Sequence, residues 1–192
     1  SSGDITIDGF PITEYSLTDL RHRIGYVMQQ SVLFSMDVKN NLAYANESSS
    51  LDDKIQKLSM AGFENYETVL PKGLETEIGE KGINLSGGQK MRVSLARAAY
   101  SQSDIYLLDD PLAALDGHVG KNIFHRMIKG DLKDKTRIIV TNNSQYLPEV
   151  DRIIMLNQGR IIFDGNYQEI SSSGLLGKFH IGSEESTSTR SE

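Results

Sequence analysis

The spacing of apolar residues changes along the chain, and the changes predict an alternation of strands and helices. Short β-rich runs predict strands at residues 5–7, 24–28, 105–108 and 136–141. The run 105–108 is continuously apolar, which is typical of a strand covered on both faces of a parallel sheet. Asp8-Gly9 is a turn pair, and two more β-rich runs around Asn157-Gln158-Gly159 predict a hairpin.

Helical spacing is clearest in the two segments that flank the run 105–108. Ser86 can cap a first helix, in which apolar residues recur at helical intervals at Val93, Ala96 and Tyr100. A second apolar stripe after residue 118 predicts a helix that ends at Gly130. Strand, helix and strand between residues 105 and 141 therefore form a βαβ unit, whose crossover should be right-handed.

These elements together predict an α/β fold with a mostly parallel core sheet. Antiparallel elements are expected at residues 3–28, and short helical pieces at 36–81 predict a helical insertion. The polar C-terminal end lacks apolar residues and should be disordered. We expect one partial domain over residues 1–180, with a core at 1–35 and 101–170, a helical subdomain at about 36–100, and a tail at 181–192.

Composition narrows the classes of function. The 192 residues carry a formal net charge of -6 with a pI of about 5.3, which argues against a nucleic-acid partner. There is no cysteine, so neither a disulfide framework nor a thiolate metal site is available. The longest apolar runs are far shorter than the roughly 20 residues that cross a bilayer, and no signal peptide is visible. Because the chain begins with Ser1 and not Met, we expect it to be a piece of a longer protein.

Two short stretches carry candidate chemistry. Ser86 is followed by two glycines where a helix should begin, and backbone N–H groups at such a place can approach an anion closely. A bare Ser-Gly-Gly is more often an ordinary helix cap. The second stretch is the apolar run that ends in Asp109 and Asp110, because burying a carboxylate is costly unless it is paired or binds a metal.

The full string Leu85-Ser86-Gly87-Gly88-Gln89 resembles the signature motif of ATP-binding-cassette (ABC) ATPases. Few motifs of this length are as specific for one family. Residues 105–111, "IYLLDDP", resemble the Walker B strand of this family. A carboxylate at the end of a parallel strand can hold a phosphate-bound Mg²⁺ there. Residues 113–116, "AALD", resemble the D-loop that follows it.

The likeness extends over most of the chain, from about residue 3 to residue 170, in the order usual for the family. Gln29 resembles the Q-loop glutamine, with the neighbouring Gln30 as the alternative match. Residues 75–82, "ETEIGEKG", resemble the stretch before the signature in exporters. "YLLDDPLAALDGHVGKNIF" and "SQYLPEVDRIIMLNQGRI" are most similar to the first nucleotide-binding domain of the C subfamily, the multidrug-resistance-associated proteins. Residues 3–23 are closer to a second domain or a half-transporter.

The resemblance implies ATP and Mg²⁺ as cofactors and a role for each matching residue. Asp109 and Gln29 would hold the metal, and Asp110, Asn142 and Gln29 would be the catalytic residues. The nucleotide-binding set would be Ser86, Gly87, Gly88, Gln89 and Asp116. ABC domains work as head-to-tail pairs, so the signature residues would serve the nucleotide held by the partner domain.

One part of the family pattern is missing from the printed sequence. No stretch satisfies G-x-x-x-x-G-K-[ST], because Gly120-Lys121 and Gly177-Lys178 lack the rest of the pattern. We therefore expect the chain to begin after the P-loop. We also expect weak or no ATP binding by residues 1–192 alone, and no activity of this isolated fragment.

Two catalytic positions are altered. Asp110 stands where the family usually has a glutamate that polarises the attacking water, and it is one methylene shorter. Asn142 replaces the switch histidine, and an amide can hydrogen-bond a phosphate but cannot carry a proton or a charge. Together the two changes predict a site that holds nucleotide and turns it over slowly.

Three hypotheses of function follow. The first is an ATPase domain that couples nucleotide cycles to export, at the cytosolic face of a membrane, through transmembrane domains and a second nucleotide-binding domain. The alternative is a regulatory ATP-holding module in a channel or receptor of the same subfamily. The third is a soluble ABC protein of DNA repair or translation, and the exporter-like stretch 75–82 and the acidic charge argue against it.

Overall fold

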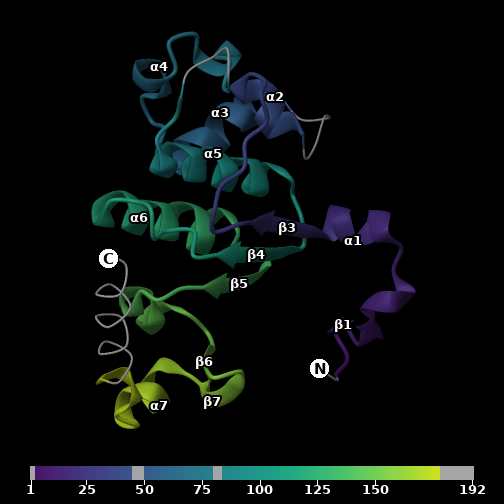
Figure 1. Cartoon of the computed structure of the whole chain (residues 1–192), viewed down its shortest axis with the longest axis vertical. Helices are drawn as coiled ribbons and strands as arrows, with labels where there is room; N and C mark the ends of the chain where they lie inside the picture. The colour runs from purple at the N-terminus through teal and green to yellow at the C-terminus, as the bar shows by residue number, and fades with distance from the viewer. Residues whose placement is uncertain (1–2, 45–49, 80–83, 178–192) are drawn as a thin grey trace, which may run out of the picture. The chain divides into compact units, whose positions relative to one another are not determined.

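The computed structural model describes residues 3–44, 50–79 and 84–177, and it forms two compact units whose boundary in sequence lies between Val140 and Thr141 (Figure 1). The first unit holds a three-stranded sheet and most of the helices, and the second holds a two-stranded sheet. Within the described ranges, no helix is both long enough and apolar enough to cross a bilayer. The predicted tail 181–192 lies outside the described residues, and the predicted domain extent stays a prediction.

A parallel sheet forms the centre of the first unit and confirms the predicted parallel core sheet. Its strand order is β3 (Ile24–Val27), β4 (Ile105–Asp109) and β5 (Thr136–Val140). In the register, Val27 lies beside Leu108, and Asp109 lies beside Val140. Because parallel strands end at one edge of the sheet, the residues that follow β3 and β4 emerge on the same side.

The expectation of antiparallel elements throughout residues 3–28 is confirmed only for the first hairpin. There β1 (Thr6–Ile7) pairs antiparallel with β2 (Phe10–Pro11) across Asp8 and Gly9. The φ angles of Asp8 and Gly9 are 52° and 85°, the left-handed values that a tight Asp-Gly hairpin turn requires. For β3 the expectation is wrong, because the long excursion between β3 and β4 gives the chain enough length to return in parallel.

One face of the sheet is more exposed than the continuously apolar run 105–108 predicts. Tyr106 and Leu108 on β4 are buried, and α5 (Gly87–Tyr100) packs against β3. On the opposite face, Tyr26, Ile138 and Val140 are each more than half exposed. On β4 itself, Ile105 and Leu107 on that face are half-buried, so the expected burial of this strand on both faces is met only in part among the described residues.

Short helices between β3 and α5 confirm the predicted helical insertion. They are α2 (Val38–Ala43), α3 (Leu51–Met60), α4 (Tyr66–Val69) and the 3₁₀ turn η2 (Gly73–Glu75). Both α2 and α3 pack against α5, and Leu42, Leu58 and Val93 have no exposed surface. Figure 1 shows α2, α3 and α4 on one side of α5.

A helix joins β4 to β5 and confirms the predicted βαβ unit. It begins as α6 (Gly117–Ile123) and continues in the wider π-helical geometry of η3 (Phe124–Asp131). Lys57 on α3 reaches Asp131 at 2.7 Å and 2.8 Å, and the two side chains are only 12% and 16% exposed. A second ion pair joins Glu64 to Arg126. The helical insertion is thus tied to the helix that leaves β4.

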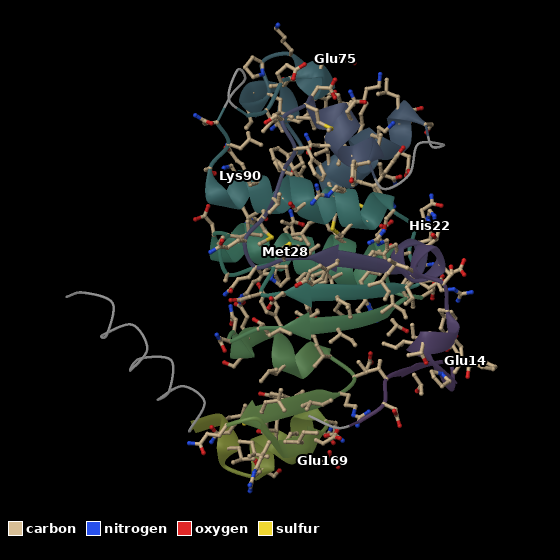
Figure 2. All side chains as sticks on the ribbon, turned by 45° about the vertical axis from the view of Figure 1, so that its right-hand side comes forward. Glu14, His22, Met28, Glu75, Lys90 and Glu169 are labelled. Atoms are coloured by element: carbon tan, nitrogen blue, oxygen red, sulfur yellow. The ribbon has the colours of Figure 1, made fainter. Side chains whose placement is uncertain are left out.

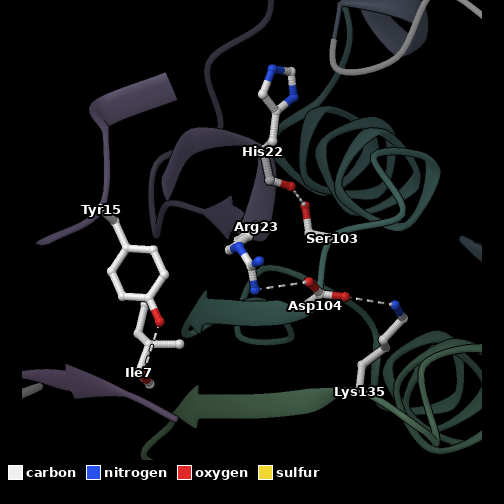
Figure 3. Close-up of polar contacts among 7 residues, drawn as sticks. All are labelled: Ile7, Tyr15, His22, Arg23, Ser103, Asp104 and Lys135. Carbon is white, nitrogen blue, oxygen red and sulfur yellow. Dashed lines mark hydrogen bonds and ion pairs between the residues drawn. The ribbon is translucent and has the colours of Figure 1, made fainter. Parts of the chain in front are cut away.

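Polar contacts hold the amino-terminal end of the sheet (Figure 3). The Asp104 carboxylate lies 3.8 Å from Arg23 and 3.3 Å from Lys135, and Ser103 donates to the His22 carbonyl at 3.2 Å. The hairpin before α1 (Leu17–Arg23) is held by Tyr15, whose hydroxyl donates to the carbonyl of Ile7, and by the 3₁₀ turn η1 (Ile12–Glu14).

The second unit consists of η4 (Ser144–Glu149), β6 (Ile153–Asn157), β7 (Arg160–Gly165) and α7 (Tyr167–Ser172). The strands pair antiparallel, and Gln158 and Gly159 have φ angles of 48° and 73°, so the predicted hairpin is confirmed. Arg152 forms a bidentate pair with Asp164, and this hydrogen bond lowers the pKa of the Asp164 carboxyl.

Candidate functional site

The carboxyl end of β4 carries the two acids that the sequence singled out, and we call Asp109 and Asp110 the acidic edge. Asp109 is the last residue of the strand and is half-buried. Asp110 is also half-buried, and its N–H donates to the Val140 carbonyl at 2.8 Å. The pairing of β4 with β5 therefore extends one residue past the strand and fixes the backbone of Asp110.

The backbone of Asp110 is strained. Its φ angle is 46°, in the left-handed region that non-glycine residues visit at a cost of roughly 1–2 kcal/mol. Asp tolerates this region better than most residues. Pro111 follows directly, and a residue before proline is ordinarily extended, so the sequence pattern predicts the opposite conformation. Backbone strain of this kind clusters at functional sites, which makes Asp110 a candidate on structural grounds alone.

The acidic edge is suited to a phosphate-bound Mg²⁺ more than to a metal held by protein alone. In the described part of the chain, none of the salt bridges involves Asp109 or Asp110. No group of three or more His, Cys, Asp or Glu side chains in that part could hold a metal ion. Mg²⁺ commonly binds through one or two carboxylates, with water and phosphate oxygens completing its shell. One carboxylate at a strand end fits that donor set.

Residues 110–116 connect the acidic edge to α6, and we call them the bridge segment. Ala113 donates to the Asp110 carbonyl at 3.3 Å, and Leu115 donates to the Leu112 carbonyl at 3.2 Å, so the segment consists of two consecutive turns. Asp116 is exposed at the start of α6, where its carbonyl accepts from Gly120 at 2.8 Å. Asp116 therefore lies at an exposed helix start, and its role in nucleotide binding stays a prediction.

Residues 85–89, which we call the signature turn, begin α5 with a complete capping box. The Ser86 hydroxyl accepts from the Gln89 N–H at 3.2 Å, and the Gln89 side chain accepts from the Ser86 N–H at 2.8 Å. The predicted cap at Ser86 is confirmed. Gly87 is exposed, so its N–H lies at the open, positive end of a 14-residue helix.

The two glycines of the signature turn have different surroundings. A Cβ added at Gly87 would meet no atom within 4 Å. A Cβ added at Gly88 would lie 2.9 Å from the Ala114 carbonyl oxygen and 3.5 Å from Leu115. The signature turn therefore packs directly on the bridge segment, a contact that nothing in the sequence pattern indicated.

Arg92 lies one helical turn beyond Gly88 on α5 and was not a predicted site residue. Its guanidinium donates to the Gly62 carbonyl at 2.9 Å and lies 4.4 Å from the centre of the Phe63 ring. Burial lowers the pKa of Arg92, and the nearby charge of Asp116 opposes that shift. The only signal in the sequence is the repetition of arginines at positions 92 and 97 of one helix.

The loop that begins at Gln29 is anchored by α5 at two points. Gln29 itself is exposed, two residues past the end of β3. The Ser31 hydroxyl donates to the sulfur of Met91 at 3.3 Å, and Arg97 donates to the Val32 carbonyl at 3.0 Å. Burial lowers the pKa of Arg97, and Tyr44 opposes the shift.

Further along the same loop, a single side chain holds the backbone. The amide of Asn41 has no exposed surface. It accepts from the Phe34 N–H and donates to the carbonyls of Phe34, Met36 and Asp37, at 2.9–3.2 Å. Asn41 thus fixes the end of the loop, while Gln29 at its start is exposed.

A cavity of about 270 Å³ lies between this loop and the start of α5. It is lined by Ser31, Val32, Leu33, Ile78, Gly79, Asn84, Leu85 and Lys90. Figure 2 shows the side chain of Lys90 on α5 and that of Met28 just before the loop. Of the exporter-like stretch 75–82, residues 75–79 are described, and they pair with residues 36–38 through Val38–Thr76 and Ile78–Met36 hydrogen bonds. The rest of that stretch lies outside the described residues.

Asn142 belongs to the second unit. It is exposed and follows the end of β5 by two residues. The neighbouring Asn143 caps the turn η4, because its side chain accepts from Gln145 at 3.0 Å. The remaining predicted residues lie in the first unit, where the structure brings Gln29 and the acidic edge to one end of neighbouring strands, and the signature turn against the bridge segment.

Comparison with known proteins gives the class of this fold. Residues 1–113 match the family model described as "ABC transporter". The chain also matches a solved structure, that of a bacterial Atm1-family ABC exporter with ATP bound, at 30% identity and a TM-score of 0.86. That match covers 95% of this chain and 32% of the exporter chain. The chain therefore belongs to the ABC transporter family, and its α/β fold with a parallel core and antiparallel strands is confirmed.

Similar curated proteins are C family members from Dictyostelium discoideum. The chain is 48% identical over 155 residues to ABC transporter C family member 8, covering 79% of the chain and 10% of the relative. It is 43% identical over 157 residues to member 12, covering 81% of the chain and 12% of the relative. The predicted likeness to the C subfamily is thus confirmed, and the chain spans about a tenth of the length of these relatives.

Proposed function

We propose that this chain contributes the ATP-binding and ATP-hydrolysing region of an ABC exporter and works head to tail with a second nucleotide-binding domain. The observation that carries the proposal is the signature turn. Its complete capping box leaves the exposed Gly87 at the positive end of a long helix, which is a ready-made place for a phosphate. Ser86, Gly88 and Gln89 shape that helix start, and the nucleotide that it contacts is the one held by the partner domain.

Each residue of the acidic edge has a separate task in this proposal. Asp109 and Gln29 hold Mg²⁺, which when bound would neutralise charge on the phosphates. Asp110 orients the attacking water and accepts its proton, and the strained backbone aims its short side chain. Asp116 lies at the exposed start of α6 and faces the partner domain's nucleotide.

The local site should turn over slowly. The carboxylate of Asp110 is one methylene shorter than the usual glutamate, and small misplacements of a base cost large factors in rate. Asn142, at the position that follows β5, offers a hydrogen bond but no titratable proton. The same two residues favour the alternative, a regulatory ATP-holding module of a C-subfamily channel or receptor, in which slow turnover would be useful.

Transmembrane domains are the second class of partner in the proposal, with the domain at the cytosolic face of a membrane. The cavity beside the loop 29–37 supports a docking role for this region, because it has both apolar and charged lining residues. The loop is also anchored to α5 through Met91 and Arg97. Movement of that loop by a membrane domain would be passed to α5 and so to the signature turn.

The test uses the complete transporter with its other nucleotide site inactivated. We expect the double variant Asp110→Glu with Asn142→His to raise ATP turnover at this site by about tenfold or more, because it restores both the reach of the base and a titratable group. The single variant Asn142→Gln, which keeps an amide, is the matched control and should leave turnover low. A double variant that is no faster than the parent would contradict the assignment of these two residues. If neither the parent nor the double variant binds radiolabelled ATP at this site, the proposed function itself is wrong.

A further inference from the structure

The signature turn and the bridge segment touch through a contact that has no room for a side chain. The Cβ position of Gly88 lies 2.9 Å from the Ala114 carbonyl oxygen, closer than real Cβ atoms approach. The neighbour is backbone, which cannot move aside as the end of a flexible side chain can. By contrast, Gly87 has open space around its Cβ position. The second glycine is therefore required by packing within this chain, independently of any phosphate.

The bridge segment cannot yield easily, because both of its ends are held. At one end, the Asp110 N–H is bound to the Val140 carbonyl at 2.8 Å, and the Asp110 carbonyl accepts from Ala113. At the other end, the Asp116 carbonyl accepts from the Gly120 N–H at 2.8 Å, which joins the segment to the first turn of α6. The segment is thus held by β5 at its start and by α6 at its end.

We propose that Gly88 is a positioning residue. Because it has no side chain, the Ala114 carbonyl can pack directly against it, and the signature turn and the bridge segment therefore move as one body. This inference rests on the proposed function for its consequence. The signature turn serves the partner's nucleotide and the bridge segment begins at Asp110 of the local site. A displacement at either nucleotide would therefore reach the other through the Gly88–Ala114 contact inside this chain.

The first experiment measures the contact itself and does not depend on nucleotide. Amide hydrogen exchange is followed at residues 113–116 in the complete protein for the parent, for Gly88→Ala and for the matched control Gly87→Ala. We expect exchange at Ala113 and Leu115 to become about tenfold faster in Gly88→Ala, because the added methyl group displaces the Ala114 carbonyl, and to be unchanged in Gly87→Ala. Unchanged exchange in both variants, or equal acceleration in both, overturns the proposal.

A measurement on the unchanged protein covers the case in which Gly88→Ala does not fold. If the two parts move as one body, the amides of Lys90, at the start of α5, and of Leu115 should open with the same equilibrium constant and respond equally to low concentrations of urea. Distinct opening constants or distinct responses to urea overturn the proposal.

The second experiment tests the functional consequence. Labelled nucleotide is trapped in the two sites of the complete transporter, and the sites are separated by proteolysis. We expect Gly88→Ala to reduce trapping at both sites and Gly87→Ala to reduce it only at the partner's site. Equal patterns in the two variants would overturn the coupling. Absence of trapping in the parent would instead refute the proposed function, and the exchange experiment would still decide the role of Gly88.

Discussion

The signature turn and the acidic edge differ in how their geometry is produced. In the signature turn, Ser86 and Gln89 satisfy each other's backbone N–H groups, so four consecutive residues specify the helix start. At the acidic edge, the position of Asp110 depends on a hydrogen bond to Val140, thirty residues away in sequence, and its backbone is strained. The signature turn therefore depends on a few neighbouring residues, whereas the acidic edge depends on contacts between distant parts of the chain.

The largest expected effects test whether the signature turn and the acidic edge unfold together as parts of one hydrophobic core. Leu95 on α5 and Leu108 on β4 are both 2% exposed, and they carry the signature turn and the acidic edge respectively. We expect Leu95→Ala and Leu108→Ala each to lower the free energy of unfolding by about 2–5 kcal/mol, in a single urea transition for the first unit. A variant in which one region melts separately from the other, as followed by hydrogen exchange, would show that the regions are independent.

An intermediate effect is expected at the signature turn. Ser86→Ala removes the cap and should cost about 1 kcal/mol of unfolding free energy, because the Gln89 N–H loses its partner. Ser86→Thr is the matched control, since its hydroxyl can still accept that bond, and thermal denaturation should place it close to the parent. If Ser86→Ala and Ser86→Thr melt alike, the capping box does not hold this turn.

The smallest expected effect has the opposite sign. Asp110→Gly should raise the free energy of unfolding by about 0.5–1 kcal/mol, because glycine takes a φ of 46° without steric cost. Asp109→Gly is the control, and it should lower stability by about the same amount, because Asp109 is a strand residue. If both Asp110→Gly and Asp109→Gly lower the free energy of unfolding in a urea titration, Asp110 is not strained. Opposite signs would mark Asp110 as a residue retained for function at the expense of stability.

The sequence alone was sufficient for the elements whose signals are local. The cap at Ser86, the turn at Asp8-Gly9 and the second hairpin each follow from two to four neighbouring residues, and each is present in the structure. The order of the family motifs was equally visible, because each motif is a short continuous string. These features need no knowledge of what packs against them.

Only the tertiary structure decided the features that join distant parts of the chain. The parallel pairing of β3, the left-handed backbone of Asp110 and the contact of Gly88 with Ala114 all depend on which backbone groups meet across the fold. Local preference pointed the other way for Asp110, since a residue before proline is normally extended. The physical reason is that propensities act over a few residues, whereas hydrogen bonds and steric contacts from remote strands and helices can outweigh them. The two carboxylates at the end of a buried strand were visible in the sequence, but the strain on one of them was not.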